Sequence, residues 1–367
     1  MNEPILSGER LRLARVALGL TLEQLGERVG ASRQYLNQIE KEQKSPTMEM
    51  IEALSAALIV DRSFLCSRPA LEVSAERCHF RKQRTTPISV AAQVTARATV
   101  FAEFLRRIDT EVSLPPVSIP TIAVETTRDI EEAAEQARSI WRLGTGPISN
   151  MTRVAENAGA VVTFFGGVSE RVDALSIDLD RPLIVRNEAK PAACRMRFDI
   201  AHEVGHLIMH RGLQTGDKFT EGQANRFASA FLLPRGAFIH EFPRSRFLSW
   251  EGIFEMKLKW KVSAAAILRR AYDLRLIDAD QYRTGNIHLT KTGQRKKERF
   301  DDILKLEEPE LVSSALAAIE EVSIGSAERL ALSVGMKGSF LSAVADLNIS
   351  EVPDQKNVAV LRRIEGS

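Results

Sequence analysis

The chain alternates between short helical patterns and one small group of strand patterns. From residue 7 to about residue 57, apolar residues three to four positions apart are separated by polar ones, and Gly19 and Gly30 interrupt the series. Residues at that spacing share one face of a helix, so the pattern predicts four or five short helices. Thr21 and Ser32 stand where N-caps are expected. This part of the chain is therefore predicted to be an all-helical domain.

The following part of the chain mixes helical and strand periods. Residues 90–112 have the pattern of a long helix and lead to residues 114–120, whose three prolines are typical of an extended linker. Beyond the linker, helices are expected at 130–141 and 148–159. Strands are expected at 160–165, 173–179 and 182–185, and the last two form a predicted hairpin about Asp180-Arg181. This order predicts an α+β domain. Residues 300–367 return to helical spacing.

The helix expected at residues 33–41 leaves several polar side chains outside. Arginine suits guanine, and glutamine or asparagine suits adenine, in the major groove of DNA. A helix, a glycine-containing turn and a second helix of this kind therefore predict major-groove reading. The candidate DNA contacts are Ser32, Arg33, Gln34, Asn37 and Gln38. Glutamates balance the basic residues in this segment, so a helical protein-interaction domain is the alternative.

Two histidines one helical turn apart give the strongest chemical signal. His202 and His206 project from the same side of the helix predicted at residues 197–210. Two imidazoles at that spacing suit a zinc ion, and Glu203 between them can act as a general base on zinc-bound water. The alternative is a buried helix whose histidines are satisfied by hydrogen bonds.

A zinc ion held by two histidines needs a third protein ligand. His210 lies one more turn along the helix, too far to converge on the same ion. Glu221 is the better candidate, because it lies near the apolar stripe that Ala224 and Phe227 begin, where a carboxylate is costly unless it is paired or binds a metal. The alternative is an ordinary first-turn glutamate favoured by the helix dipole.

Four blocks in residues 141–234 resemble the ImmA/IrrE family of zinc metallopeptidases. The blocks are residues 141–144 with 146–148, residues 171–176, residues 198–210, and residues 221–228 closing on 232–234. The resemblance implies that His202, His206 and Glu221 hold Zn²⁺ and that Glu203 is the catalytic base. It also implies that the substrate is a repressor or a similar regulatory protein. Gln223 stands where family members often have glutamate, which favours Glu221 as the ligand.

The N-terminal segment is similar to the phage-repressor (Xre, Cro/C1-type) helix-turn-helix. The similarity rests on residues 20–26, 29–32, 39–40 and 45–47. It implies double-stranded DNA as a partner, with base-reading positions at Arg33, Gln34 and Gln38. Leu22 replaces a glutamine that the family usually places there to touch phosphate. This departure weakens the expectation of tight DNA binding.

Length, composition and net charge indicate the number of domains and the cellular location, but they do not identify a reaction. A chain of 367 residues should hold two or three domains, and a net charge of +2 gives no argument for nucleic acid or membrane binding. No apolar run approaches the length of a membrane span, and the N-terminus lacks a signal pattern. Three widely spaced cysteines suit reduced thiols. These features predict a cytoplasmic protein with no membrane partner.

The sequence thus predicts a multidomain fold. An all-α helix-turn-helix domain at 6–66 and a basic, helical linker at 67–120 precede an α+β zincin-like metallopeptidase domain at 121–290 and a helical region at 291–367. The predicted function is a DNA-binding transcriptional regulator fused to a zinc endopeptidase that cleaves a regulatory protein, and a homodimer is compatible with it. The alternatives are a transcription factor whose zinc domain senses a ligand or partner without proteolysis, and an antitoxin-like binding protein.

Overall fold

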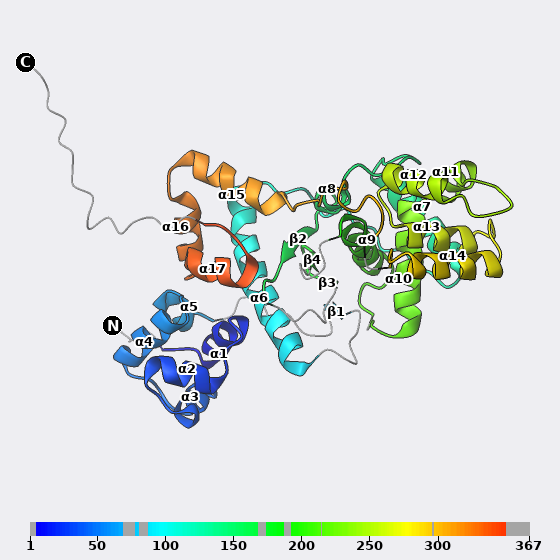
Figure 1. The fold of residues 1–367 in the computed structure, drawn as a ribbon. Coiled ribbons are helices and arrows are strands. Elements are labelled where there is room, and N and C mark those ends of the chain that lie inside the picture. Colours follow the sequence, from blue (N-terminus) through cyan, green and yellow to red (C-terminus); the bar gives the residue numbers. More distant parts are fainter. Residues whose placement is uncertain are drawn as a thin grey trace, which may run out of the picture. The chain divides into compact units, whose positions relative to one another are not determined.

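The structure, a computed structural model, describes residues 5–68, 78–80, 87–167, 174–186, 192–213, 215–295 and 297–349. These residues form two compact units (Figure 1). The first unit combines Met1–Glu72, Thr99–Ser113 and Ser313–Ser367, and the second combines Val73–Ala98 and Leu114–Val312, each over its described residues. The domain boundaries predicted from the sequence follow the expected functions and not these two compact units, so they stay a prediction.

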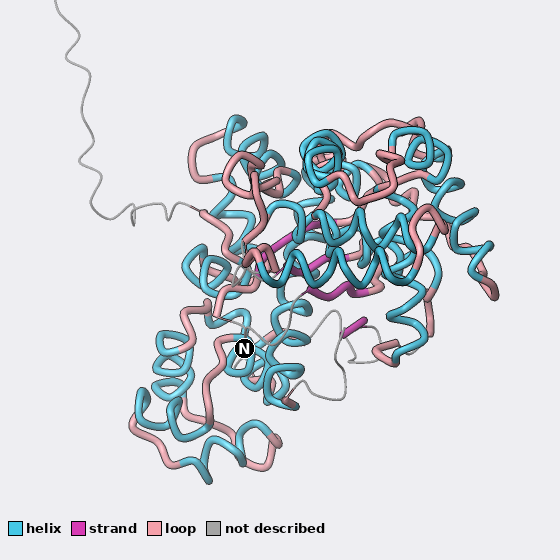
Figure 2. The backbone as a smooth tube through the Cα atoms, turned by 45° about the vertical axis from the view of Figure 1, so that its right-hand side comes forward, coloured by secondary structure: helices cyan, strands magenta, loops and turns pink. Residues whose placement is uncertain are grey.

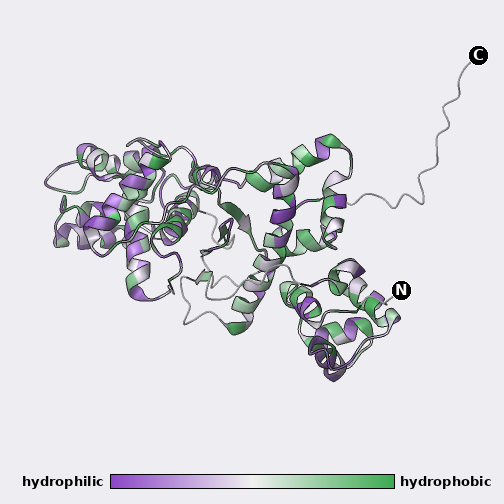
Figure 3. Ribbon diagram, turned by 180° about the vertical axis from the view of Figure 1, so that it is seen from behind, coloured by the Kyte–Doolittle hydropathy of each residue, from purple (hydrophilic) through white to green (hydrophobic). Residues whose placement is uncertain are grey.

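The first unit is helical throughout its described residues. Its elements are α1 (Gly8–Ala17), α2 (Leu22–Val29), α3 (Arg33–Glu40), α4 (Met48–Ala57), α5 (Arg62–Cys66), the second half of α6 (Ile88–Glu111), α15 (Leu311–Val322), α16 (Ser326–Ser333) and α17 (Gly338–Ala345). The helices near the N-terminus carry both hydrophobic and hydrophilic residues (Figure 3). The helices predicted at the N-terminus are therefore confirmed.

Local capping explains where the N-terminal helices begin. Thr21 and Gln24 form a reciprocal capping box at the start of α2, and the Ser32 side chain accepts a hydrogen bond from the Tyr35 amide at the start of α3. Gly30 ends α2 with a φ of 67°, a left-handed conformation that glycine adopts without steric cost. Both predicted N-caps and the predicted turn are thus in place.

The C-terminal helices pack on the N-terminal ones within the first unit. Val60 and Met336 form an isolated antiparallel bridge, and the Phe64 and Phe340 rings meet edge to face with centroids 5.8 Å apart. Gly335 has a φ of 72°, and a Cβ atom there would lie 2.4 Å from the Phe64 nitrogen. This close approach explains the glycine, and it gives the C-terminal region a packing role that the sequence did not reveal.

Helix α6 carries a buried ion pair with the first helix. Arg10 Nη1 lies 2.6 Å from Glu103 Oε2, and Arg10 Nη2 donates to the Arg68 carbonyl. By length and composition, α6 could span a membrane, but 61% of its most apolar stretch is buried inside the protein, as in a core helix. The long helix predicted at residues 90–112 is confirmed as this element.

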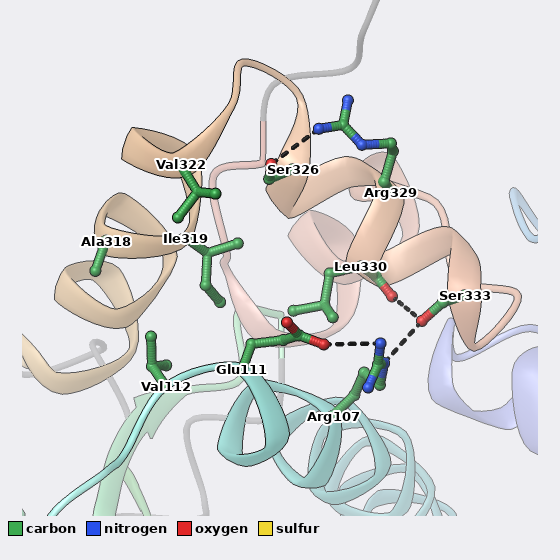
Figure 4. A pocket seen from close by; sticks show the side chains of 10 residues that line it. All are labelled: Arg107, Glu111, Val112, Ala318, Ile319, Val322, Ser326, Arg329, Leu330 and Ser333. Atoms are coloured by element: carbon green, nitrogen blue, oxygen red, sulfur yellow. Dashed lines mark hydrogen bonds and ion pairs between the residues drawn. The ribbon is translucent and has the colours of Figure 1, made fainter.

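A cavity of about 270 Å³ lies between the end of α6 and helices α15 and α16 (Figure 4). Arg107 lies 2.8 Å from Glu111, and Arg329 donates to the Ser326 hydroxyl over 2.9 Å. The rest of the lining comprises Val112, Ala318, Ile319, Val322, Leu330 and Ser333. The charged groups of this cavity are therefore already paired with the protein itself.

The second unit places a small sheet among helices. Its helices, besides the first half of α6, are α7 (Thr127–Ile140), α8 (Met151–Asn157), α9 (Ala193–Met209), α10 (Lys218–Leu232), α11 (Arg235–Glu241), α12 (Trp250–Trp260), α13 (Ala264–Asp273) and α14 (Ala279–Lys291). Its strands, drawn in magenta in Figure 2, are β1 (Cys78–Phe80), β2 (Val161–Phe164), β3 (Ala174–Ile177) and β4 (Leu183–Arg186). Their order in the sheet is β1-β3-β4-β2.

Strand pairing confirms the predicted hairpin and adds one strand. Strands β3 and β4 are antiparallel, with Ala174 opposite Arg186, and β2 runs parallel to β4. Strand β1 pairs antiparallel with β3 and had no expected counterpart, because three residues are too few for an alternating pattern to be recognised. The second unit is thus an α+β unit, as predicted.

Helix α9 lies between the sheet and α10 (Figure 1), and almost every side chain on it is buried. Its Gly205 allows α10 to come close, because a Cβ atom there would lie 2.9 Å from Phe227 Cδ1. The glycine costs about 1 kcal/mol of helix propensity relative to alanine. That cost is offset by the close packing of the two helices that carry the candidate metal ligands.

Some predicted features lie outside the described residues. They include Arg77, Arg81, Lys82 and Arg84 of the basic segment, residues 171–173 of one resemblance block, and residues 350–367 of the C-terminal region.

The Arg10–Glu103 pair generates a stability prediction. Glu103→Ala should destabilise the first unit by about 3–5 kcal/mol, because it leaves a buried guanidinium without its charge partner. Hydrogen exchange of the α1 amides measures the loss. The control is Glu111→Ala on the same helix, which breaks a pair whose side chains are 37% and 43% exposed and should cost under about 1 kcal/mol. Equal protection of α1 in both variants would contradict the prediction.

Candidate metal centre

The site begins with two fully buried histidines on α9. His202 and His206 each have 0% exposed surface, and their ring centroids are 4.8 Å apart. Their Nε2 atoms lie 3.1 Å from each other, so both rings present the same edge to one point. The one-turn spacing read from the sequence therefore produces the expected shared direction.

Glu221 reaches the same point from the first turn of α10. Asp217 caps that helix by accepting hydrogen bonds from the Phe219 and Thr220 amides. The Glu221 carboxylate oxygens then lie 3.3 Å from His202 Nε2 and 3.2 Å from His206 Nε2. Within the described part of the chain, this is the one set of three His, Cys, Asp or Glu side chains whose ligand atoms converge.

The spacing of these atoms suits zinc. Ligand atoms about 2.0–2.2 Å from a tetrahedral ion lie roughly 3.3 Å apart, close to the observed 3.1–3.3 Å. Glu221 Oε1 is buried and has no hydrogen-bond partner among the described residues. A buried carboxylate oxygen without a donor is costly, and a cation at the convergence point would remove that cost. The residues present therefore fit a bound Zn²⁺.

The protonation states also suit metal binding. Burial lowers the pKa of His206 to about 4, which keeps this imidazole neutral at pH 7. Burial opposes ionisation of Glu221, but the close approach of the His202 and His206 imidazoles outweighs it and lowers the pKa of this carboxyl to about 2. Metal ligands must be a neutral imidazole and an ionised carboxylate, so both groups are ready near neutral pH.

Three further side chains hold the histidines in place. The Asn225 Oδ1 atom lies 3.1 Å from His202 Nδ1, the ring nitrogen that does not face the converging group. The Nδ1 atoms of His206 and His210 lie 2.9 Å apart, and His210 Nε2 lies 2.8 Å from Gln223 Oε1. His210 is thus outside the converging group, as predicted, and supports a ligand from behind.

Glu203 is buried, with 1% of its surface exposed, and is bound to the sheet. The Ser176 hydroxyl of β3 donates a hydrogen bond to Glu203 Oε2 over 2.7 Å. This contact fixes the carboxylate beside the two histidines without making it part of the converging group. Ser176 and Asn225 lie in two of the resemblance blocks, but no role was predicted for them, because the spacing of residues does not show which strand or helix faces α9.

The candidate DNA contacts lie on α3 in the first unit. Arg33 and Gln34 are exposed, Asn37 and Gln38 are half-buried, and Ser32 caps the helix. Arg33 Nη1 lies 2.8 Å from Glu23 Oε1, in a pair whose side chains are 70% and 52% exposed. An exposed pair of this kind is worth about 0–1 kcal/mol, so a phosphate or a base could replace Glu23.

Two family models match the chain. Residues 155–272 match the peptidase M78 family, described as an IrrE N-terminal-like domain, and residues 11–65 match a helix-turn-helix family. Both matches fall where the sequence predicted these domains. A propionyl-CoA carboxylase regulator of Cereibacter sphaeroides is 25% identical over 284 residues, which cover 67% of this chain. The matched region spans 61% of the length of that relative.

The converging group predicts which substitutions remove zinc. His202→Ala or Glu221→Ala should abolish stoichiometric zinc, because each removes one of three protein ligands. His210→Ala should keep zinc after purification but lower its affinity about 10–100-fold, the usual cost of losing a group behind a ligand. Elemental analysis and chelator competition measure both. The exposed His240→Ala is the control, and full zinc in Glu221→Ala would refute the ligand assignment.

Proposed function

Because the chain joins a helix-turn-helix domain to an IrrE-like domain, we propose that it is a DNA-binding regulator whose second unit is a zinc endopeptidase. The observation that carries the proposal is the convergence of His202, His206 and Glu221 beside the buried Glu203. A metal site with an adjacent carboxylate that is not a ligand is the arrangement needed for metal-assisted hydrolysis.

The chemistry divides between the ion and the side chains around it. Zinc, which His202, His206 and Glu221 would hold, would polarise the scissile carbonyl and lower the pKa of a water toward about 7. Glu203 accepts the proton of that water and delivers it to the leaving amine. Ser176 holds the Glu203 carboxylate in position through its hydrogen bond, and Asn225 and His210 fix the two imidazole rings.

The proposed substrate is an extended segment of a regulatory protein. Strand β3 packs against α9 and carries Ser176, so a peptide added along this sheet would pass close to Glu203. Resemblance to the ImmA/IrrE peptidases supports a repressor-like target. The similar protein of Cereibacter sphaeroides is named a regulator, which supports a role in transcription.

The proposal also covers DNA and location. Exposed Arg33 and Gln34 at the start of α3 support major-groove reading of double-stranded DNA. A protein that binds DNA and cleaves regulators would work in the cytoplasm, and a homodimer is compatible with this function.

A second candidate function is sensing by the metal domain without proteolysis. The name of the similar regulator favours it, since a regulator need not cleave its partner. An antitoxin-like binding protein is a variant of this candidate. Glu203 separates the two candidates, because a site that only binds has no use for a buried base beside its metal ligands.

Glu203→Gln tests the peptidase. This variant keeps the volume of the side chain and should fold, hold zinc and bind its target, while cleavage falls by about 10²–10⁴, the usual contribution of a general base. Integrity of co-expressed repressors and reporter output should be measured in the same cells. The matched control is Glu255→Gln, an exposed glutamate of α12. Normal regulation by zinc-loaded Glu203→Gln would defeat the peptidase and favour sensing.

Substitutions on α3 test DNA reading. Arg33→Ala or Gln34→Ala should cost about 1–3 kcal/mol of specific binding, and the cost should depend on the base opposite. Competition binding to a selected operator and to its single-base variants measures the effect. Gln136→Ala, which removes an exposed glutamine from α7 in the other unit, should change nothing. Equal weakening on every sequence would favour a protein-interaction domain.

A further inference from the structure

Strand β1 occupies the outer edge of the sheet beside the proposed peptidase site. Its three residues pair antiparallel with β3, with Cys78 opposite Ile177, His79 opposite Ser176 and Phe80 opposite Leu175. Strand β3 has β4 on its other side. Both edges of β3 are therefore taken by strands of the chain itself.

The register brings β1 to the residue that positions the catalytic base. Ser176 faces His79 across the strand pair, and its hydroxyl donates to Glu203 Oε2 over 2.7 Å. Residues directly opposite each other in an antiparallel pair have Cα atoms about 4.5–5.5 Å apart. The backbone of β1 thus passes one strand spacing from the residue bonded to Glu203.

An extended protein substrate that pairs directly with β3, the strand that carries Ser176, needs the edge that β1 covers. Peptides that bind by strand addition use the unpaired N–H and C=O groups of an edge strand. On β3 those groups face β4 on one side and β1 on the other. A substrate can pair with β3 opposite Ser176 only if β1 leaves.

Strand β1 is anchored on the helix that leads to the DNA-binding unit. Cys78 has 3% exposed surface, and its thiol is hydrogen-bonded with Thr95 of α6. Burial raises the pKa of this thiol to about 12. Helix α6 begins in the second unit and continues into the first, where Glu103 pairs with Arg10. The segment that covers β3 is therefore part of the covalent connection between the two units.

We propose that β1 is an internal inhibitory strand, which excludes protein substrates from the β3 edge until it is displaced. This inference rests on the proposed peptidase function and names the regulation of the same site. The displacing partner is an extended peptide segment that pairs antiparallel with Ala174–Ile177. The peptidase is accordingly held inactive by its own connection to the DNA-binding unit.

The test replaces two residues of β1 with proline. Consecutive amides of a strand point to opposite sides, so His79→Pro with Phe80→Pro removes whichever of the two donors faces β3. The matched control is Ile88→Pro, which also creates a proline pair, with Pro87, in the same connection. Ile88 is 90% exposed and is the first residue of α6, where proline is tolerated.

Release of the strand is read first from Cys78. At neutral pH, alkylation of Cys78, followed by peptide mass spectrometry, should be at least tenfold faster in the double-proline variant than in wild type or Ile88→Pro. Cys194, buried on α9 with a pKa also raised to about 12, is the internal reference and should not change. Unchanged alkylation of Cys78 would show that β1 is not released by loss of pairing and would overturn the inference.

Access to the edge is read from binding, without any hydrolysis. The probe is a labelled synthetic peptide that copies residues 74–84 with serine in place of Cys78, added to zinc-loaded protein that carries Glu203→Gln. It should bind the double-proline variant at least tenfold more tightly than Ile88→Pro. In the protein without proline substitutions, excess peptide should accelerate alkylation of Cys78. Equal binding to both variants, or no binding to either, would overturn the inference.

Inhibition is read from cleavage of casein by the zinc-loaded proteins. The double-proline variant should cleave at least tenfold faster than wild type and Ile88→Pro. If all variants cleave at the same rate although Cys78 is released, β1 is not inhibitory and the peptidase proposal stands. If none cleaves casein, the Glu203→Gln test with co-expressed repressors decides the peptidase proposal, and the peptide binding above decides whether β1 covers a binding edge.

Discussion

The structure of the second unit depends on the burial of polar groups along α9. His202, His206 and Glu203 lie in a helix whose side chains are almost all buried, and each of the three has at most 1% of its surface exposed. Each buried polar group must find a partner inside the protein or the fold loses free energy. Glu221 in the first turn of α10 lies beside His202 and His206, and Ser176 of β3 donates to Glu203. The sheet and the second helix are thus the source of the partners that α9 needs.

Much of the site could be predicted because it depends on the spacing of one helix. The distance from His202 to His206 is fixed by helical geometry. The same geometry places His210 one turn too far along the helix to bind the same ion. Glu221 was predicted from a buried stripe and from family resemblance together. The contacts of Ser176, Asn225 and Gln223 depend on how two further elements face α9. Such facing is set by tertiary packing, and no local pattern in the sequence encodes it.

The fold shows the same division between local and distant effects. The N-terminal helices follow from caps and glycines that act within a few residues, and the hairpin follows from two short apolar runs on either side of Asp180-Arg181. The association of α16 and α17 with the N-terminal helices joins residues far apart in the chain, through Phe64 with Phe340 and the close approach at Gly335. Strand β1 is too short for its three residues to carry a period. Sequence patterns therefore predict the elements well and their distant partners poorly.

The close approach of α9 and α10 at Gly205 also bears on which ion the site selects. A cation would sit between two imidazole nitrogens of one helix and a carboxylate of the other, so the separation of the helices sets the bond lengths it can adopt. Affinity alone would favour copper over zinc at a nitrogen and oxygen site. The packing of Gly205 against the Phe227 ring instead fixes the distance between the two helices, which limits the metal–ligand distances that the site allows. Selectivity for the metal would then depend on the packing of Gly205, the residue next to the ligand His206, against the Phe227 ring of α10.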